Sequence, residues 1–348
     1  MSSPQPEYPS SRKHSHSSFR AFIMLILSGH EIDQCLPMST AIKGMKQAFA
    51  ASSAGNVEIP NRTILSLGNA SDLAIFMPSH IKDSSRASIK SLTFLPENEV
   101  KGLPIIQAVV LIFDSLNGSP LALLEGSRLT AIRTAAGGGA SVDLLARKDS
   151  ESLAMLGSGQ QAKAGIEAAC AVRDIKLVRL YSPTPGNAEN LAEELSENNW
   201  CPEIRVVADP DKAVSEADII WTATTSPIPT FSAASVALGT HIVGIGSFQP
   251  SMIEIDPSVL SAASVFVDQL EATWLEAGEI IDARARGLID SNDVKELGEI
   301  VLGLHPGRMN NEEITVFKSV GIAAQDAIAS SIALDTATTN GLGTTVQL

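Results

Sequence analysis

The first third of the chain alternates short apolar runs with polar turn signals, a pattern typical of strands. An apolar run over 21–27 predicts a strand, and apolar residues at helical spacing over 42–49 predict one helix. Further β-type runs follow at 62–67, 73–77, 88–95, 107–113 and 121–124. Asn117-Gly118 lies between the last two runs and is a strong hairpin signal, so this part predicts an antiparallel meander.

From residue 130 the pattern becomes helical and then alternates strands with helices. Three glycines at 137–139 lie inside the first helix, which we interpret as close packing on a sheet or a second subunit, with ligand approach as the alternative. The segments that follow predict strands at 153–156, 177–181, 204–207, 219–222, 241–244 and 265–268, and helices at 160–172, 187–195 and 211–216. Alternation of this kind predicts a parallel sheet covered by helices on both faces.

The pattern therefore predicts an α/β fold with two domains and a tail. Residues 1–20 carry no apolar periodicity and are expected to form a flexible tail, with an organelle-targeting segment as the weaker alternative. A Rossmann-type doubly wound parallel sheet is expected over 135–314. A smaller α+β domain is expected over 21–134 together with 315–348, and we predict that 315–335 form one helix returning to it.

Composition and charge exclude several classes of protein. Lys+Arg number 25 against 39 Asp+Glu, a net charge of −14, which disfavours a general nucleic-acid binder. The apolar run at 21–27 is far shorter than the roughly 20 residues that span a bilayer, so no membrane partner is expected. Cys35, Cys170 and Cys201 form no Cys-x-x-Cys pair, so we expect no disulfide framework, no metal site and a cytoplasmic location.

One glycine-rich motif carries most of the predicted chemistry. Residues 156–162 read Leu-Gly-Ser-Gly-Gln-Gln-Ala, a G-x-G-x-x-A element between a predicted strand and a predicted helix. Gly157 would make the tight turn, Gly159 would let the backbone approach a pyrophosphate, and Ala162 would let the helix pack on the strand. The alternative is a turn without a ligand, but the strand and helix units that follow favour dinucleotide binding.

Dinucleotide-binding folds often carry an acid for the ribose 2′-hydroxyl about 20 residues after this motif. Here 181–185 read Tyr-Ser-Pro-Thr-Pro, with no acid and no arginine. Because nothing repels a 2′-phosphate and Ser182 can bond it, we expect NADP(H) to be favoured, with NAD(H) as the alternative. Two small-residue turns at 222–227 and 244–247 follow strands at the same edge, where cofactor contact is expected rather than a plain turn.

Three cations stand in apolar or strand-like surroundings, with no acid next to them in the sequence: Arg62, Lys90 and Arg133. A buried cation is costly unless it is paired. A substrate carboxylate and an ordinary salt bridge to a distant Asp or Glu explain the three equally well.

Several of these segments together resemble the ornithine cyclodeaminase/mu-crystallin family. The resemblance covers about 35–335 and rests on Lys90 in its strand and on the segments 130–136, 156–162, 239–241, 254–256 and 315–321. It implies a homodimer whose N-terminal sheet builds the subunit contact and the substrate pocket, beside a Rossmann domain that holds NAD(H) or NADP(H). The first of the two predicted domains would thus serve substrate binding and dimerisation.

The resemblance also assigns roles to individual residues. It implies that Arg62, Lys90 and Arg133 grip the substrate carboxylate, and Lys90 and Arg133 are the expected catalytic residues. Besides the glycine-rich motif, it implies cofactor contacts by Thr134, Ser158, Gln160, Ser182, Thr184, Asn187, Thr224, Ser247 and Ser319.

Members of the family reduce cyclic imino acids, interconvert amino and keto acids, or cyclise ornithine. Cyclodeaminases carry a catalytic aspartate after the fifth strand, and we assign Ser247 to that position. Cyclodeamination needs a positioned base, whereas an iminium is already electrophilic and the cofactor supplies its hydride. We therefore expect reduction of an imino acid such as 1-pyrroline-2-carboxylate or 1-piperideine-2-carboxylate. Ornithine or lysine cyclodeamination and a crystallin-like NADPH-retaining binding protein are the alternatives.

The remaining residues of interest are one apolar position in a strand and several polar residues for which we expect structural roles. Val109 stands where relatives often have a substrate-facing threonine. We expect Glu254 and Asp256 to cap a helix near Pro257 rather than act as bases, and Asp326 to serve in helix packing. The six histidines form no recognisable acid–base triad.

Overall fold

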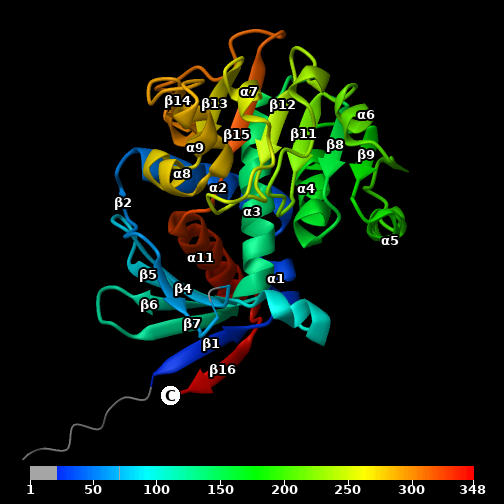
Figure 1. The fold of residues 1–348 in the computed structure, drawn as a ribbon. Helices are drawn as coiled ribbons and strands as arrows, with labels where there is room; N and C mark the ends of the chain where they lie inside the picture. Colours follow the sequence, from blue (N-terminus) through cyan, green and yellow to red (C-terminus); the bar gives the residue numbers. More distant parts are fainter. Residues whose placement is uncertain (1–21, 70) are drawn as a thin grey trace, which may run out of the picture.

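Two eight-stranded sheets organise the chain in the computed structural model, which describes residues 22–69 and 71–348 (Figure 1). The tail predicted for 1–20 lies outside the described residues. The first sheet has the order β16-β1-β7-β6-β5-β4-β2, with β3 paired to β4. Its strands are β1 (Ile23–Leu27), β2 (Val57–Glu58), β3 (Thr63–Ser66), β4 (Leu73–Ile81), β5 (Arg86–Phe94), β6 (Ile106–Asp114), β7 (Pro120–Glu125) and β16 (Thr344–Gln347).

The antiparallel meander predicted from the sequence is confirmed. Strands β3 to β7 pair antiparallel in succession, and β1 joins β7 as a parallel neighbour. The turn between β6 and β7 contains Gly118 at φ +78°, a backbone conformation that glycine adopts without strain. The register places Lys90 of β5 opposite Met77 of β4 and Val110 of β6, in the middle of the sheet.

The second sheet is entirely parallel and has the order β10-β9-β8-β11-β12-β15-β13-β14. Its strands are β8 (Ser152–Leu156), β9 (Leu177–Tyr181), β10 (Glu203–Val206), β11 (Ile219–Thr222), β12 (His241–Gly244), β13 (Ala263–Val267), β14 (Val294–Glu296) and β15 (Ile314–Lys318). The chain runs outward from β8 in both directions, so the doubly wound Rossmann-type sheet is confirmed. In such sheets ligands bind at the carboxyl ends of the central strands.

Helices cover both sheets and join them. They are α1 (Gly29–Cys35), α2 (Met38–Ser53), α3 (Gly126–Leu145), α4 (Gln160–Cys170), α5 (Pro185–Ser196), α6 (Pro210–Val214), α7 (Pro257–Leu260), α8 (Leu270–Glu276), α9 (Gly278–Ala285), α10 (Leu297–Val301) and α11 (Ala323–Asn340). Figure 1 shows α3, in teal, running from the first sheet up along the second. No helix in the described part of the chain is long and apolar enough to cross a membrane.

The three glycines of α3 serve close packing, as predicted. A Cβ at Gly138 would lie 2.5 Å from the Trp221 ring of β11, and one at Gly139 would lie 2.9 Å from Ile42 of α2. Side chains at these positions would push α3 away from its neighbours. The middle of the helix therefore lies against both the second sheet and α2. Its beginning lies against the first sheet, where a Cβ at Gly126 would be 2.7 Å from the Ala108 backbone of β6.

The helix predicted for 315–335 is wrong at its beginning. Residues Ile314–Lys318 form β15 in the middle of the second sheet, and α11 begins only at Ala323. A short continuous apolar run such as Thr-Val-Phe fits a buried strand and a buried helix equally well, because periodicity does not separate them. Gly321, at φ +81°, lies between the two elements. Residues 314–318 thus belong with the second sheet, while α11 packs on β4, β5 and β6 of the first.

Candidate active site

Three cations from separate parts of the chain line one cavity of about 240 Å³. Arg62 precedes β3, Lys90 lies on β5, and Arg133 lies on α3. Lys90 is 1% exposed and Arg133 is 5% exposed. The structure thus brings together the three residues that the sequence analysis singled out.

Each of these cations also contacts a distant carboxylate. Asp326 of α11 pairs with two of them, at 2.8 Å from Oδ2 to Lys90 Nζ and 3.0 Å from Oδ1 to Arg133 Nε. Arg62 Nη2 lies 2.8 Å from Glu276 Oε2 of α8 and donates to the Gly321 carbonyl at 3.0 Å. The alternative of salt bridges to distant acids is therefore confirmed for all three cations. Asp326, expected to serve in helix packing, forms two of these ion pairs instead. Among the side chains in these direct ion pairs, three cations share two carboxylates, which leaves one surplus positive charge in the cluster.

The buried environment changes the titration of this cluster. Burial, reinforced by the positive charge of Arg133, lowers the pKa of Lys90 to about 8, although Asp326 opposes the shift. Burial alone would raise the pKa of Asp326, but Arg133 and Lys90 outweigh it and hold that pKa below its usual value. Most Lys90 side chains are therefore charged at neutral pH, and they lose the charge as the pH rises through about 8.

The glycine-rich turn lies at the carboxyl end of β8 and begins α4. Gly157 adopts φ +123°, and a Cβ there would lie 2.5 Å from the Ala223 carbonyl oxygen, so only glycine fits. The N-terminus of α4 has no side-chain cap, which leaves its backbone N–H groups for an anion. A cavity of about 450 Å³ lies beside this turn and is lined by Ser158, Gly159, Gln160 and Asn187 among others.

The remaining residues predicted to contact a cofactor fall into three groups. Thr134, Thr224 and Ser319 line the 240 Å³ cavity. Ser158 donates a hydrogen bond to Ser182 at 3.0 Å, and Ser182 also accepts one from the Thr184 N–H. Ala162 is fully buried and packs in the core, as its predicted role requires.

The structure places Ser247 away from the cavity, contrary to the prediction. Its side chain is fully buried, where its hydroxyl donates to Glu279 and accepts from Lys318 at 2.5 Å. The neighbouring residues Gly246 and Phe248 line the cavity instead. The side chain that this turn presents to the site is thus a phenylalanine, and it still provides no carboxylate. Val109, at the position where relatives often have a substrate-facing threonine, is 43% exposed and lines a different cavity on the first sheet.

Glu254 has a role that the sequence did not reveal. It does not cap α7, whereas Asp256 does, by accepting from the Ser258 N–H. The Glu254 carboxylate is fully buried and accepts from the backbone of Thr224 at 2.6 Å and of Gly246 at 2.7 Å. It therefore ties together the two strand-end turns that line the cavity. Lys318, also fully buried, lies 4.0 Å from it.

Two further polar groups in the cavity were not identified from the sequence. Thr130 Oγ1 and Gln161 Oε1 both line the cavity and are buried without a hydrogen-bond partner in the described part of the chain. Buried polar atoms without partners are uncommon, so each is open to a ligand. A signal was available for Thr130, because it lies three residues before Arg133 and shares a helix face with it.

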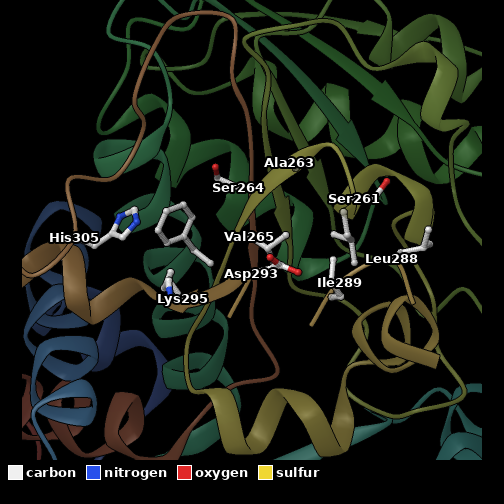
Figure 2. A pocket seen from close by; sticks show the side chains of 11 residues that line it. Ser261, Ala263, Ser264, Val265, Leu288, Ile289, Asp293, Lys295 and His305 are labelled. Atoms are coloured by element: carbon white, nitrogen blue, oxygen red, sulfur yellow. The ribbon is translucent and has the colours of Figure 1, made fainter. Parts of the chain in front are cut away.

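A further cavity, of about 310 Å³, lies along β13 and β14 (Figure 2). Figure 2 shows His305 and Lys295 on one side of it and Leu288 and Ile289 on the other. It contains one lysine rather than a group of cations, and neither the glycine-rich turn nor the residues of the cluster line it. The 240 Å³ cavity is therefore the candidate active site.

Known proteins resemble this chain over most of its length. A family model described as the ornithine cyclodeaminase/mu-crystallin family matches residues 24–340. The chain belongs to this family. A Delta(1)-pyrroline-2-carboxylate reductase of Bacillus cereus is 38% identical over 326 residues, covering 93% of this chain and all of the relative. Ketimine reductase mu-crystallin of Mus musculus is 31% identical, covering 89% of this chain and 96% of the relative.

A solved structure is similar over the same length. Thermococcus litoralis Delta(1)-pyrroline-2-carboxylate reductase, in complex with NADH and L-proline, matches with a TM-score of 0.89 and 37% identity. The match covers 93% of this chain and all of the other chain. The fold and the family predicted from the sequence are therefore confirmed.

Proposed function

We propose that this protein is an NAD(P)H-dependent reductase of small imino acids. Its substrate is a ketimine such as 1-pyrroline-2-carboxylate or 1-piperideine-2-carboxylate, which it converts to the amino acid. The observation that supports this most directly is the surplus positive charge at the 240 Å³ cavity, which a substrate carboxylate would neutralise. A water molecule occupies about 30 Å³ in the liquid, so a cavity of about 240 Å³ has room for roughly eight groups of that size. This volume suits a molecule with the size of a ring amino acid.

The residues of the cavity divide the work of binding. Arg133 and Lys90 hold the carboxylate by charge, and Arg62 approaches it from the other side. Holding the carboxylate end of a small molecule fixes the position of its imine carbon near the carboxyl ends of the strands of the second sheet. Such orientation is a large part of catalysis. NAD(P)H, when bound, supplies the hydride. The free oxygens of Thr130 and Gln161 are placed to accept a hydrogen bond from the iminium N–H, which favours the protonated, electrophilic form.

The residues around the glycine-rich turn fit a dinucleotide. Open backbone N–H groups at the start of α4 would bind the pyrophosphate, and Ser158 and Ser182 would bind the ribose. Because 181–185 contain no acid, we propose that NADP(H) is favoured over NAD(H). Calorimetric titration tests this: NADPH should bind more tightly than NADH, and Ser182→Asp should weaken NADPH more than NADH. Equal affinities would count against the preference.

Reduction fits the cavity better than cyclodeamination does. No Asp or Glu is among its lining residues in the described part of the chain, so no free carboxylate base is available there. Ornithine and lysine would also bring a second ammonium group to a site that already has a surplus positive charge. The presence of three cations around one cavity likewise favours an enzyme over a binding protein that retains NADPH without catalysis.

We also propose that two copies of the chain pair through the first sheet. Leu65 of β3 and Val109 of β6 are 51% and 43% exposed, and both lie on the face of the sheet that points away from Lys90. A cavity of about 700 Å³ is open on the same sheet and adjoins the start of α3. An exposed apolar surface of this kind marks an interaction site. Light scattering on the purified protein should give the mass of a dimer, and a monomer mass would refute the pairing.

The proposed activity is tested by mixing purified protein with NADPH or NADH and each ketimine. Consumption of the reduced nicotinamide, with formation of proline or pipecolate, is expected. The same protein with ornithine and NAD should release no ammonia. Failure to oxidise either coenzyme with any of these imino acids, or with pyruvate plus amines, would end the proposal.

A further inference from the structure

The wall of the cavity opposite the cations is aromatic. Lys90, Leu92 and Phe94 alternate along β5, so their side chains share one face of the strand, and all three line the cavity. Phe248, in the turn after β12, lines it from the second sheet. The rings of Phe94 and Phe248 meet edge to face, with centroids 6.2 Å apart and an interplanar angle of 81°. One aromatic pair therefore bridges the two sheets at the site.

The charges of the cavity are confined to its other end. Arg62, Lys90 and Arg133 are the ionisable residues among those that line it in the described part of the chain. A distal ammonium group would be desolvated there without a carboxylate partner and repelled by the surplus positive charge. A distal carboxylate held beside Phe94 and Phe248 would meet ring edges instead of a cation. Either charge would lose hydration there without an oppositely charged partner.

We propose that the Phe94–Phe248 pair determines substrate specificity by holding the hydrocarbon body of the imino acid. The site then selects ketimines whose body is an uncharged apolar ring, and it discriminates against short linear imines and against substrates with a second charge. This inference rests on the proposed reductase activity. It adds two residues that supply selectivity rather than chemistry.

The physical basis is the loss of apolar surface from water. A pocket that gains or loses one methylene contact changes discrimination by about tenfold or more. The methylenes of a pyrroline or piperideine ring would lie against the two phenyl rings, whereas the imine of pyruvate and methylamine has no such ring. Removing a phenyl group should therefore weaken the binding of the ring substrates selectively, mainly by raising their KM.

The test compares kcat/KM on 1-piperideine-2-carboxylate, 1-pyrroline-2-carboxylate and the imine of pyruvate with methylamine. For Phe248→Ala and Phe94→Ala, kcat/KM on the six-membered ring should fall by about tenfold or more, and on the linear imine by less than about threefold. The double variant should lose less than the product of the two single losses, because the two rings contact each other. Leu116→Ala, which removes an apolar side chain that is 83% exposed, is the matched control and should change nothing.

Affinity for NADPH and the melting temperature report whether each variant is folded. If an alanine variant loses either, Phe248→Leu and Phe94→Leu keep an apolar side chain and are measured instead, with the same direction of change and a smaller size. An equal loss on all three imines, or an unchanged ratio between them, would overturn the specificity role. If the unmodified protein reduces no imino acid, the proposed function itself fails, which is a different result from an active protein whose selectivity ignores the two rings.

Discussion

Replacing Lys90 with methionine should remove the surplus charge that binds the substrate. In the unmodified protein, Lys90 and Arg133 share the single negative charge of Asp326, so one positive charge remains. Without Lys90, the pair of Arg133 and Asp326 is neutral. A substrate carboxylate would then bring an unpaired negative charge into a site where both acidic and basic partners are almost completely buried.

The size of the effect follows from the burial of the pair. Truncating one partner of a buried charged contact costs about 2 to 5 kcal/mol, which corresponds to a fall in kcat/KM of about 30-fold to several thousandfold. The loss should appear with 1-pyrroline-2-carboxylate, while the Kd for NADPH changes little. Lys90→Arg keeps the charge and should lose less than Lys90→Met.

A second substitution makes the charge argument stricter. Adding Asp326→Asn to Lys90→Met leaves Arg133 as an unpaired cation and restores the surplus positive charge. The double variant should therefore recover about tenfold or more of the kcat/KM lost by Lys90→Met alone. Melting temperatures measured in parallel show whether both variants are folded. If the folded double variant is worse than the single one, Asp326 acts by contact rather than by charge, and the reasoning is refuted.

Three further predictions concern the same cavity and its supports. Burial lowers the pKa of Lys90 to about 8, and only the ammonium form binds a carboxylate. The value of kcat/KM should therefore fall as the pH rises through about 8. A pH profile that is flat through that range would contradict the role of Lys90 in binding the substrate. Gly321→Ala should lower kcat/KM about 100-fold, because its φ is +81° and a Cβ would lie 2.8 Å from Arg133 Nη1; near-normal kinetics would show that Arg133 moves freely. Glu254→Ala should lower the free energy of unfolding in urea by about 3 kcal/mol, since the backbone N–H groups of Thr224, Gly246 and Ser247 lose their buried acceptor, and an unchanged midpoint would disprove that support.

The sequence was most informative where local pattern and fold are coupled. The alternation of strands and helices from residue 152 and the glycines of 157–159 were sufficient to predict the parallel sheet and the turn that begins α4. The meander was equally clear, because each strand ends at a turn signal such as Asn117-Gly118. In these regions the local sequence determines the backbone conformation. The backbone in turn determines which edge of the sheet can bind a ligand.

It was least informative about partners far apart in the chain. Arg133 and Asp326 are separated by 193 residues, so no spacing could show that a carboxylate lies between Arg133 and Lys90. The turn at 246–248 has no periodicity, so the side chain that faces the cavity could not be chosen, and Ser247 was selected where Phe248 is correct. The strand at 314–318 was missed because four of its five residues are buried, which removes the alternation that marks a half-buried strand.

The carboxylate clamp is tested most directly by removing the carboxylate from the substrate. The measurement is kcat/KM on 1-pyrroline-2-carboxylate and on 1-pyrroline, which has the same ring and imine but no carboxylate. If Arg62, Lys90 and Arg133 bind that group, the substrate without it should be at least about 100-fold poorer, and Lys90→Met should narrow the difference. Equal kcat/KM on the two compounds would contradict the account.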